Sequence, residues 1–285
     1  MFNFRTRFAP SPTGYLHLGH AYSAFFASQM SEDKTFELRI ENIDNTRCRP
    51  EYEEAIIEDL SWLDLNWPNP VRRQSEHMED YQAALAKLEN MGLTYPCFCS
   101  RKEIQQEINA AGNAPHITPN DPDRFLYPGT CRKKDLIEHK DKLDAGMPYA
   151  VRLKTDKAIN LVGPLTWVDI DVGKQVARPE IFGDVILARK DTPSSYHLAV
   201  TIDDAIQNIT LVTRGHDLFE ASHIHRLIQA LLGLPTPEYR HHRLIIGPDG
   251  KRLAKRNKVP TIRQLRAEGK TPKNIRDLVN FEYRH

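Results

Sequence analysis

The sequence predicts an α/β fold in which a nucleotide-binding domain is interrupted by an insertion and followed by a small appendage. Three observations support this prediction. A strand, a tight turn and an apolar helix follow one another over residues 1–30, strand-like alternation recurs over 36–41 ahead of a helix, and the strand–helix pattern returns over 184–232. The stretch from 95 to 193 differs in character, because it holds three of the four cysteines and several prolines.

The turn between the first strand and the first helix carries residues suited to binding a phosphate. Phenylalanines alternate with polar residues over 2–8, two prolines and a glycine form the turn, and an apolar helix is expected over 21–30. Such a helix start directs free N–H groups and a partial positive charge toward an anion. His17 and His20 bracket Gly19, so both imidazoles could donate to phosphate oxygens while the glycine allows close approach. The alternative is two surface histidines beside a turn.

The other elements follow from periodicity and capping signals. Apolar and charged residues alternate over 36–41, which predicts a strand with one buried face and with Glu41 at its end. Pro50, with acidic residues after it, predicts a helix start, and a helix over 76–91 should end at Gly92. The remaining expected elements are a capping box at 100–103 opening a helix toward Gly112, an exposed loop at 112–122, a strand-rich stretch over 149–170, strands at 184–188 and 208–213, and helices at 219–232, 261–268 and 272–279.

Composition and charge predict a cytoplasmic, globular protein. Its 285 residues include 39 Lys and Arg and 38 Asp and Glu, a formal net charge of +1. No apolar run reaches the ~20 residues that span a bilayer, and Arg5 and Arg7 exclude the apolar core of a signal peptide. Residues 240–285 hold 13 basic against 4 acidic residues. A basic end of this kind is suited to a nucleic-acid backbone, although ordinary solvated helices have similar compositions.

Three cysteines and a tyrosine in the insertion have a spacing that can hold a metal. The candidate ligands are Cys97, Cys99, Tyr127 and Cys131. Three thiolates and a phenolate could close a tetrahedral structural zinc site, in which the phenolate would be an unusual ligand. His116 and His139 are alternative ligands, and buried thiols without metal are the other interpretation.

Residues 7–20 resemble the start of class I aminoacyl-tRNA synthetases, whose H-x-G-H signature cradles ATP, and more narrowly the glutamyl branch of that family. Segments 39–44, 214–218 and 251–256 follow in the expected order, and the last resembles the lysine signature loop that completes the ATP site. Ala9-Pro10-Ser11 is similar to glutamyl rather than glutaminyl enzymes, so the resemblance implies glutamate. It also implies a Rossmann-type catalytic domain in two halves, 1–94 and 194–240, a zinc-bearing α+β insertion at 95–193, and a lysine loop with a short helical, stem-contacting subdomain at 241–285.

Adenylate chemistry and this resemblance together give the ATP site. Charge builds on the phosphates as a carboxylate attacks the α-phosphorus, so positive groups must be in place beforehand. The candidate catalytic residues are His17, His20 and Lys255, and the candidate ATP contacts add Gly19, Arg252 and Leu253. Magnesium is expected with ATP. Ala254 stands where synthetases often have serine, so one hydroxyl contact is absent.

Glutamate has two carboxylates and one ammonium, which need opposite partners. Arg7 and Arg214 offer planar donors for carboxylates, with Arg7 assigned to the side-chain carboxylate, and Glu41 offers a counter-charge for the ammonium. The resemblance adds Ala9, Ser11 and Tyr196 to this set. An ordinary ion pair between Arg39 and Glu41 on the strand is the alternative. Asn42 stands where glutamyl enzymes often carry an acid.

The substrate expectation comes from the end of the sequence and from the cysteine pattern. Full-length glutamyl-tRNA synthetases continue into a long helical region that reads the anticodon, whereas this sequence extends 30 residues past Lys255. The Cys, Cys, Tyr, Cys pattern is similar to glutamyl-synthetase paralogues that attach glutamate to queuosine in the anticodon loop of tRNA(Asp). The resemblance thus implies ATP, L-glutamate and queuosine-bearing tRNA(Asp) as partners and one structural Zn²⁺ per chain, and we expect a monomer. A truncated enzyme that charges a tRNA 3′ end and a non-catalytic tRNA-binding paralogue are the alternatives.

Overall fold

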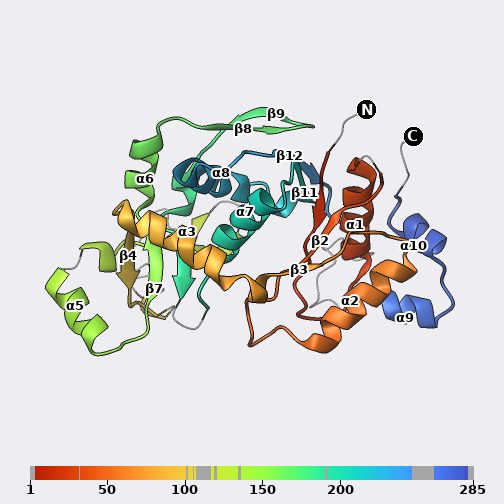
Figure 1. The fold of residues 1–285 in the computed structure, drawn as a ribbon, viewed down its shortest axis with the longest axis horizontal. Coiled ribbons are helices and arrows are strands. Elements are labelled where there is room, and N and C mark those ends of the chain that lie inside the picture. Colours follow the sequence, from red (N-terminus) through yellow and green to blue (C-terminus); the bar gives the residue numbers. More distant parts are fainter. Residues whose placement is uncertain are drawn as a thin grey trace.

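The computed structural model describes most of the chain between residues 4 and 281. The described ranges are 4–31, 33–100, 102–104, 106, 117–118, 121–133, 136–189, 192–245 and 260–281. Figure 1 shows an elongated molecule with a parallel sheet near its middle, helices packed around that sheet, and a second, antiparallel sheet toward the end opposite the two termini. The mixed α/β architecture confirms the expected fold class.

Two groups of parallel strands meet at the centre. In the first group β2 pairs with β1 and with β3; in the second β12 pairs in parallel with β11 and β8, and β9 adds an antiparallel edge. The carbonyl of Arg5 accepts the N–H groups of Thr210 and Leu211 at 3.0 and 3.2 Å, so the chain leading into β1 lies beside β11. The strands are β1 (Arg7–Phe8), β2 (Glu37–Ile40), β3 (Arg72–Arg73), β8 (Thr166–Asp169), β9 (Gly173–Val176), β11 (Leu211–Gly215) and β12 (Glu238–His242).

The strand order reverses between β1 and β11, because the chain runs from β1 outward to β2 and β3 and later from β11 outward to β12. In open α/β sheets a ligand binds outside the carboxyl ends of the strands at such a switch point. Residues directly after β1 and β2, and at the end of β11, therefore face one place.

One apolar core lies between the first strands and the terminal helices. Phe25 on the first helix and Ile56 on the second are fully buried in it, together with Ile262 and Ile275 from the C-terminal part of the chain. Figure 1 shows the last two helices beside the first two. These helices are α1 (Leu18–Met30), α2 (Pro50–Trp62), α9 (Ile262–Ala267) and α10 (Pro272–Leu278).

A second core is formed by helices that pack with β7 and β10. Tyr81, Leu198 and Ile224 are fully buried there. Gly92 ends the third helix at a φ of 68°, a left-handed conformation that glycine adopts without strain. The helices are α3 (Met78–Asn90), α6 (Thr155–Val162), α7 (Tyr196–Ile206) and α8 (Ala221–Leu232), with short 3₁₀ turns η1 (Gln74–Glu76), η3 (Pro179–Phe182) and η4 (His216–Leu218).

The antiparallel sheet ends at Cys97 in β4, lies near Cys99 and Cys131, and is toward the left in Figure 1. β7 pairs with β4 and with β10, and β5 pairs with β6 in a separate hairpin. The elements are β4 (Thr94–Cys97), β5 (Ile117–Thr118), β6 (Asp121–Phe125), β7 (Ala150–Leu153), β10 (Ile186–Arg189), α5 (Leu136–Asp144) and the turn η2 (Cys131–Lys133).

Most expected elements are present within a few residues of their expected bounds, including the capping box in which Glu103 N donates to Ser100 Oγ and Ser100 N to Glu103 Oε2. The helix expected from 100 toward Gly112 lies mostly outside the described residues. One expected element differs and one helix was missed: the stretch over 149–170 contains helix α6, whose first N–H donates to Asp184 Oδ1, and α7 was not predicted at all. The expected loop at 112–122 falls mostly outside the described residues, but β5 and the start of β6 lie within it.

Strands β8 and β9 fall inside the expected insertion yet extend the sheet of β11 and β12. The domain boundaries stay a prediction. Within the described ranges, no helix combines the length and the apolar character that crossing a membrane requires.

Candidate active site

A cavity of about 500 Å³ lies at the switch point between β1 and β11. Its wall contains the ends of β1 and β2, the start of α1, the start of α7 and the end of β11. Every predicted glutamate contact and every predicted ATP contact before residue 250 lines it: Arg7, Ala9, Ser11, His17, Gly19, His20, Glu41, Tyr196 and Arg214. The predicted contacts Arg252, Leu253 and Lys255 lie outside the described residues.

His17 and His20 close the start of α1 in a reciprocal cap. Gly19 N donates to His17 Nδ1 at 3.1 Å, and His17 N donates to His20 Nδ1 at 3.2 Å. Because each Nδ1 accepts a backbone N–H, the proton of each neutral ring lies on Nε2. The two rings, with centroids 3.8 Å apart, thus each carry an Nε2–H donor at a helix N-terminus that lines the cavity. This is an arrangement suited to phosphate oxygens.

Gly19 is required by the close approach of the His17 ring. A Cβ atom at position 19 would lie 3.0 Å from His17 Cε1 and 3.2 Å from its Nδ1. Any side chain there would push the ring away from the backbone N–H that it caps. The glycine of the signature therefore preserves the position of His17.

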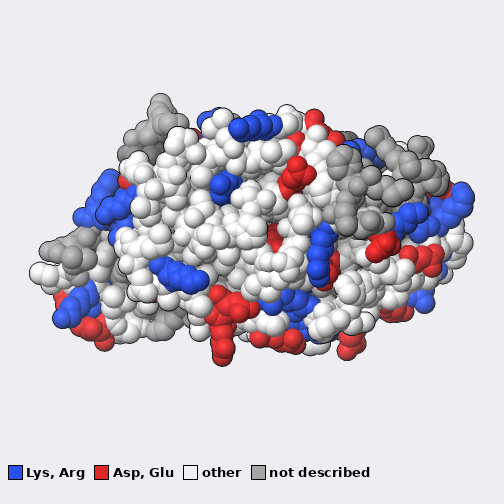
Figure 2. Space-filling view, turned by 45° about the horizontal axis from the view of Figure 1, so that its top comes forward, with Lys and Arg blue, Asp and Glu red and all other residues white. Residues whose placement is uncertain are grey.

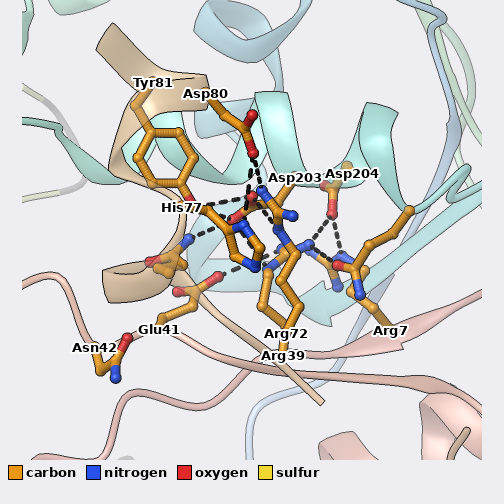
Figure 3. A network of polar contacts seen from close by, with 12 residues as sticks. Arg7, Arg39, Glu41, Asn42, Arg72, His77, Asp80, Tyr81, Asp203 and Asp204 are labelled. Atoms are coloured by element: carbon orange, nitrogen blue, oxygen red, sulfur yellow. Dashed lines mark hydrogen bonds and ion pairs between the residues drawn. The ribbon is translucent and has the colours of Figure 1, made fainter. Parts of the chain in front are cut away.

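Arg7 enters the cavity from β1 and is held by an ionic network. Its Nε donates to Asp204 Oδ1 at 3.1 Å and its Nη1 to the carbonyl of Thr213 at 2.7 Å. Figure 3 shows Arg39 reaching the same carboxylate, at 2.9 Å from Nη1, while Arg72 and Tyr81 contact Asp203. Burial alone would raise the pKa of Asp204, but the charges of Arg7 and Arg39 outweigh it and hold that pKa below its usual value.

Glu41 follows β2 and lines the same cavity. Its backbone N–H donates to the carbonyl of Pro10 at 3.0 Å, which fixes it beside the first turn. Its Oε1 lies 3.4 Å from Arg39 Nη2, so the predicted alternative of an ion pair on the strand is present as well. Burial raises the pKa of Glu41 to about 7, against the lowering effect of Arg39 and Arg7. A ligand ammonium would restore the charged form.

Arg214 reaches the cavity from the end of β11 and is held without a carboxylate. Its Nε donates to His241 Nε2 at 3.1 Å, its Nη1 to His225 Nδ1 at 3.2 Å and its Nη2 to Ser222 Oγ at 2.7 Å. These partners come from β12 and α8. Neither these histidines nor Asp203 and Asp204 were predicted from the sequence. Their local signals are two adjacent acids within an apolar helix and a histidine pair at the end of a strand.

Comparison with known proteins gives the family. The family model described as "tRNA synthetases class I (E and Q), catalytic domain" matches residues 3–281. The chain belongs to this family.

Relatives of two kinds are similar to this class I synthetase chain. A protein of Rhodobacter capsulatus named "Glutamyl-Q tRNA(Asp) synthetase" is 45% identical, over 97% of this chain and 99% of its own length. The Aquifex aeolicus protein named "Glutamate--tRNA ligase" is 36% identical over 96% of this chain and 56% of its own length. The crystal structure of a glutamate tRNA ligase from Elizabethkingia meningosepticum, in complex with its amino acid, superposes with a TM-score of 0.71 at 30% identity, covering 91% of this chain and 54% of that chain. The chain thus spans about half the length of these two ligases.

A second cavity of about 500 Å³ adjoins the first in this synthetase chain. The two share Ser11, Glu41 and Tyr196, and the second extends to Tyr127 and Arg152 beside the cysteines. A group bound in one cavity would therefore meet a group bound in the other at these shared side chains.

The predicted metal residues lie together at the far side of that second cavity. The sulfur atoms of Cys97, Cys99 and Cys131 all lie within 4.8 Å of one another. Tyr127 Oη lies 3.5 Å from Cys99 Sγ and accepts the Cys131 N–H at 2.7 Å. Three sulfurs and one oxygen at this spacing fit the donor set of a structural zinc ion. His139 is buried but belongs to no metal-binding group found among the described residues.

Proposed function

We propose that this synthetase activates L-glutamate with ATP and transfers the glutamyl group to queuosine in the anticodon loop of tRNA(Asp). In the first step a carboxylate oxygen of glutamate attacks the α-phosphorus, and the bond to pyrophosphate breaks. In the second step a hydroxyl oxygen of queuosine attacks the acyl carbon, AMP leaves, and the hydroxyl proton is released. The observation that carries the proposal is the single cavity in which anion donors adjoin an acidic and basic set matched to glutamate.

The cavity divides by charge into two parts. His17, His20 and the α1 N-terminus supply donors for the triphosphate, where charge develops in the transition state. Arg7 and Arg214 supply donors for carboxylate, and Glu41 accepts the ammonium. We assign Ala9, Ser11 and Tyr196 to the same glutamate pocket and Arg252, Leu253 and Lys255 to the ATP site. Magnesium enters with ATP; Asp217 is a carboxylate in the cavity wall that can ligate it directly or through water.

One observation favours queuosine over a tRNA 3′ end. The relative named "Glutamyl-Q tRNA(Asp) synthetase" is 45% identical and matched over 99% of its length, whereas the Aquifex ligase is 36% identical and matched over 56% of its length. The second cavity gives an acceptor nucleoside of either kind a place beside Glu41 and Tyr196. Figure 2 shows basic side chains at the right-hand end of the molecule, over α9 and α10, where Arg263, Arg266 and Lys273 are exposed. These can contact the RNA backbone. We expect a cytoplasmic monomer.

Zinc is proposed for the cluster of Cys97, Cys99, Tyr127 and Cys131. Bound there, it would fix the antiparallel sheet against η2 and so shape the wall of the second cavity. Metal analysis of the purified protein should give one zinc per chain. Cys97→Ser should lose it, while Cys48→Ser, a matched change outside the cluster, should keep it. Equal metal content in both variants would remove the site.

The transfer reaction is tested with labelled glutamate, ATP and either tRNA(Asp) or tRNA(Glu). Each tRNA is used with an intact 3′ end and with a 3′ end blocked by periodate oxidation. Periodate also cleaves the ring diol of queuosine, so the 3′-blocked tRNA(Asp) is oxidised before queuosine is introduced into it. Label on 3′-blocked, queuosine-bearing tRNA(Asp) is expected. Label confined to intact tRNA(Glu) would show instead a synthetase that charges a terminal adenosine. If no tRNA is labelled and pyrophosphate exchange does not depend on glutamate, both transfer to queuosine and charging of a terminal adenosine are contradicted.

A further inference from the structure

Arg214 is a buried cation whose three hydrogen-bond partners are all neutral. His241, His225 and Ser222 accept from its guanidinium, and among the described residues no carboxylate pairs with it directly. Only 6% of its surface is exposed. Burial of an arginine normally brings a carboxylate against it, because an uncompensated buried charge is costly. The exception here needs an explanation.

The tautomers of both histidines follow from the arginine. A guanidinium can only donate, so His241 Nε2 and His225 Nδ1 must both accept. The proton of His241 therefore lies on Nδ1, which is 2.7 Å from Asp169 Oδ2. The proton of His225 lies on Nε2 and is donated to His197 Nδ1 at 3.1 Å. Hydrogen bonds thus connect, in this order, Asp169, His241, Arg214, His225 and His197. His197 lines the wall of the second cavity.

Asp169 is a fixed anchor for this series. Its Oδ1 accepts the backbone N–H groups of Asp171 and Val172 at 3.0 and 3.1 Å in the turn between β8 and β9. Its Oδ2 accepts both the ring and, at 3.3 Å, the backbone N–H of His241. Four N–H donors thus fix the Asp169 carboxylate, which in turn fixes the orientation of the His241 ring.

We propose that Asp169, His241 and His225 are positioning residues that orient Arg214 and keep its charge available to a carboxylate of the bound glutamate. The inference rests on the proposed glutamate pocket. Placing an imidazole between Asp169 and Arg214 lets the carboxylate set the ring's direction without neutralising the arginine at contact distance. Protonation of either ring would place a donor against a guanidinium donor. Burial, helped by the charge of Arg214, lowers the pKa of His241 to about 2, so its ring stays neutral at working pH.

Asp169→Asn tests the proposal with little change in shape. The amide oxygen can keep the two N–H groups of the β8–β9 turn, while the amide nitrogen would face His241 Nδ1 and favour the tautomer that presents Nε2–H to Arg214. Asp171→Asn is the matched control, because Asp171 lies in the same turn and, among the described residues, its carboxylate pairs with Arg240 alone, at 2.9 Å. Glutamate binding is measured by calorimetry, and the KM values for glutamate and ATP by pyrophosphate exchange.

Asp169→Asn should raise the glutamate Kd and KM at least ~10-fold, with the ATP KM within ~2-fold, and Asp171→Asn should change neither. Equal glutamate affinity in the two variants would overturn the positioning role while leaving the proposed function standing. Wild-type protein that binds no glutamate would overturn the proposed function and this inference together. Because Asp169→Asn could fail to fold, ¹⁵N spectra of histidine-labelled wild-type protein give an independent result: the Nδ1–H tautomer for His241 supports the series, and the Nε2–H tautomer refutes it.

Discussion

Arg7 and Arg214 line one cavity from neighbouring strands, but the protein holds them in opposite ways. Arg7 contacts Asp204 directly, within a buried network that also contains Arg39, Arg72, Asp203 and Glu41 (Figure 3). Arg214 contacts imidazoles and a hydroxyl. The first arrangement balances charge inside the protein and so stabilises the junction of β1, β2 and α7. The second leaves a cation to be balanced by a ligand.

This difference predicts different roles for Arg7 and Arg214. Removing an anion from the Arg7 network should cost folding stability, because fully buried Arg39 would lose one of the carboxylates that balance its charge. Removing Arg214 should cost mainly glutamate affinity. The predictions below separate these two effects.

Asp204→Ala should give the largest effect, a loss of about 3–5 kcal/mol in the free energy of unfolding measured by urea titration. The variant leaves Arg39, with none of its surface exposed, short of a carboxylate that lies 2.9 Å away in the wild type. Glu37→Ala is the comparison, since Glu37 pairs with Arg5, whose side chain is 52% exposed. The loss of unfolding free energy in Glu37→Ala should stay below about 1 kcal/mol. Similar losses in the two variants would mean that the network around Arg7 is not a stabilising feature.

Arg214→Gln should lower kcat/KM for glutamate in pyrophosphate exchange by about 10²- to 10³-fold, with a smaller loss for Arg7→Gln. Within the part of the chain that the structure describes, no carboxylate pairs with Arg214, whereas the charge of Arg7 is already shared with Asp204. Circular dichroism should show both variants folded. A greater loss for Arg7→Gln would invert the assignment of roles.

The sequence was sufficient for the local parts of this site. The turn before α1 is built from neighbours in the chain, so His17, Gly19 and His20 could be recognised together, and Glu41 follows from a strand that ends beside that turn. Arg7 and Arg214 were chosen because a guanidinium suits a carboxylate, each as an isolated residue. Their convergence at one cavity depends on the strand order, which periodicity does not determine.

The partners of the arginines could not be predicted, because they are tertiary. Asp204 lies 197 positions from Arg7, and Asp169 is 72 positions from His241. Helix α7, which carries Asp203 and Asp204, was not predicted. Helix α6 was taken for part of a strand-rich stretch, since its start is fixed by a distant contact to Asp184 and its Ala158 is buried in the second core. Local propensity gives way to such packing.

The pH dependence of kcat/KM for glutamate tests the acidic residue of the glutamate pocket, Glu41, separately from the two arginines. Glu41 must be charged to attract the ammonium, and burial raises its pKa to about 7. Below that pH the group takes up a proton, so kcat/KM should fall, by about tenfold at pH 6 relative to pH 8. The histidines around Arg214 should add nothing, because the pKa of His241 is lowered to about 2.

Glu41→Gln should remove this slope and leave a low, pH-independent rate, with the ATP KM measured in parallel as the control. A wild-type profile that is flat between pH 6 and 8 would place the pKa of Glu41 nearer its ordinary value, and the ionic network would then be less desolvated than the structure indicates.

Gly19→Ala should give the smallest effect. It tests the ATP-binding part of the cavity separately from Arg7 and Arg214. The added Cβ would lie 3.0 Å from His17 Cε1, so the ring must move, and the ATP KM should rise about three- to tenfold while the glutamate KM stays near the wild-type value. Stability should not fall, because alanine favours a helix over glycine by up to about 1 kcal/mol.

Gly92→Ala is the reciprocal control: its φ of 68° makes a side chain costly, yet nothing lies within 4 Å of its Cβ position. It should lose about 1 kcal/mol of unfolding free energy with both KM values unchanged. If Gly19→Ala instead raised the glutamate KM as much as the ATP KM, the histidines and the arginines would be acting as one unit, and differences between the Arg7 and Arg214 variants could no longer be attributed to how each arginine is held.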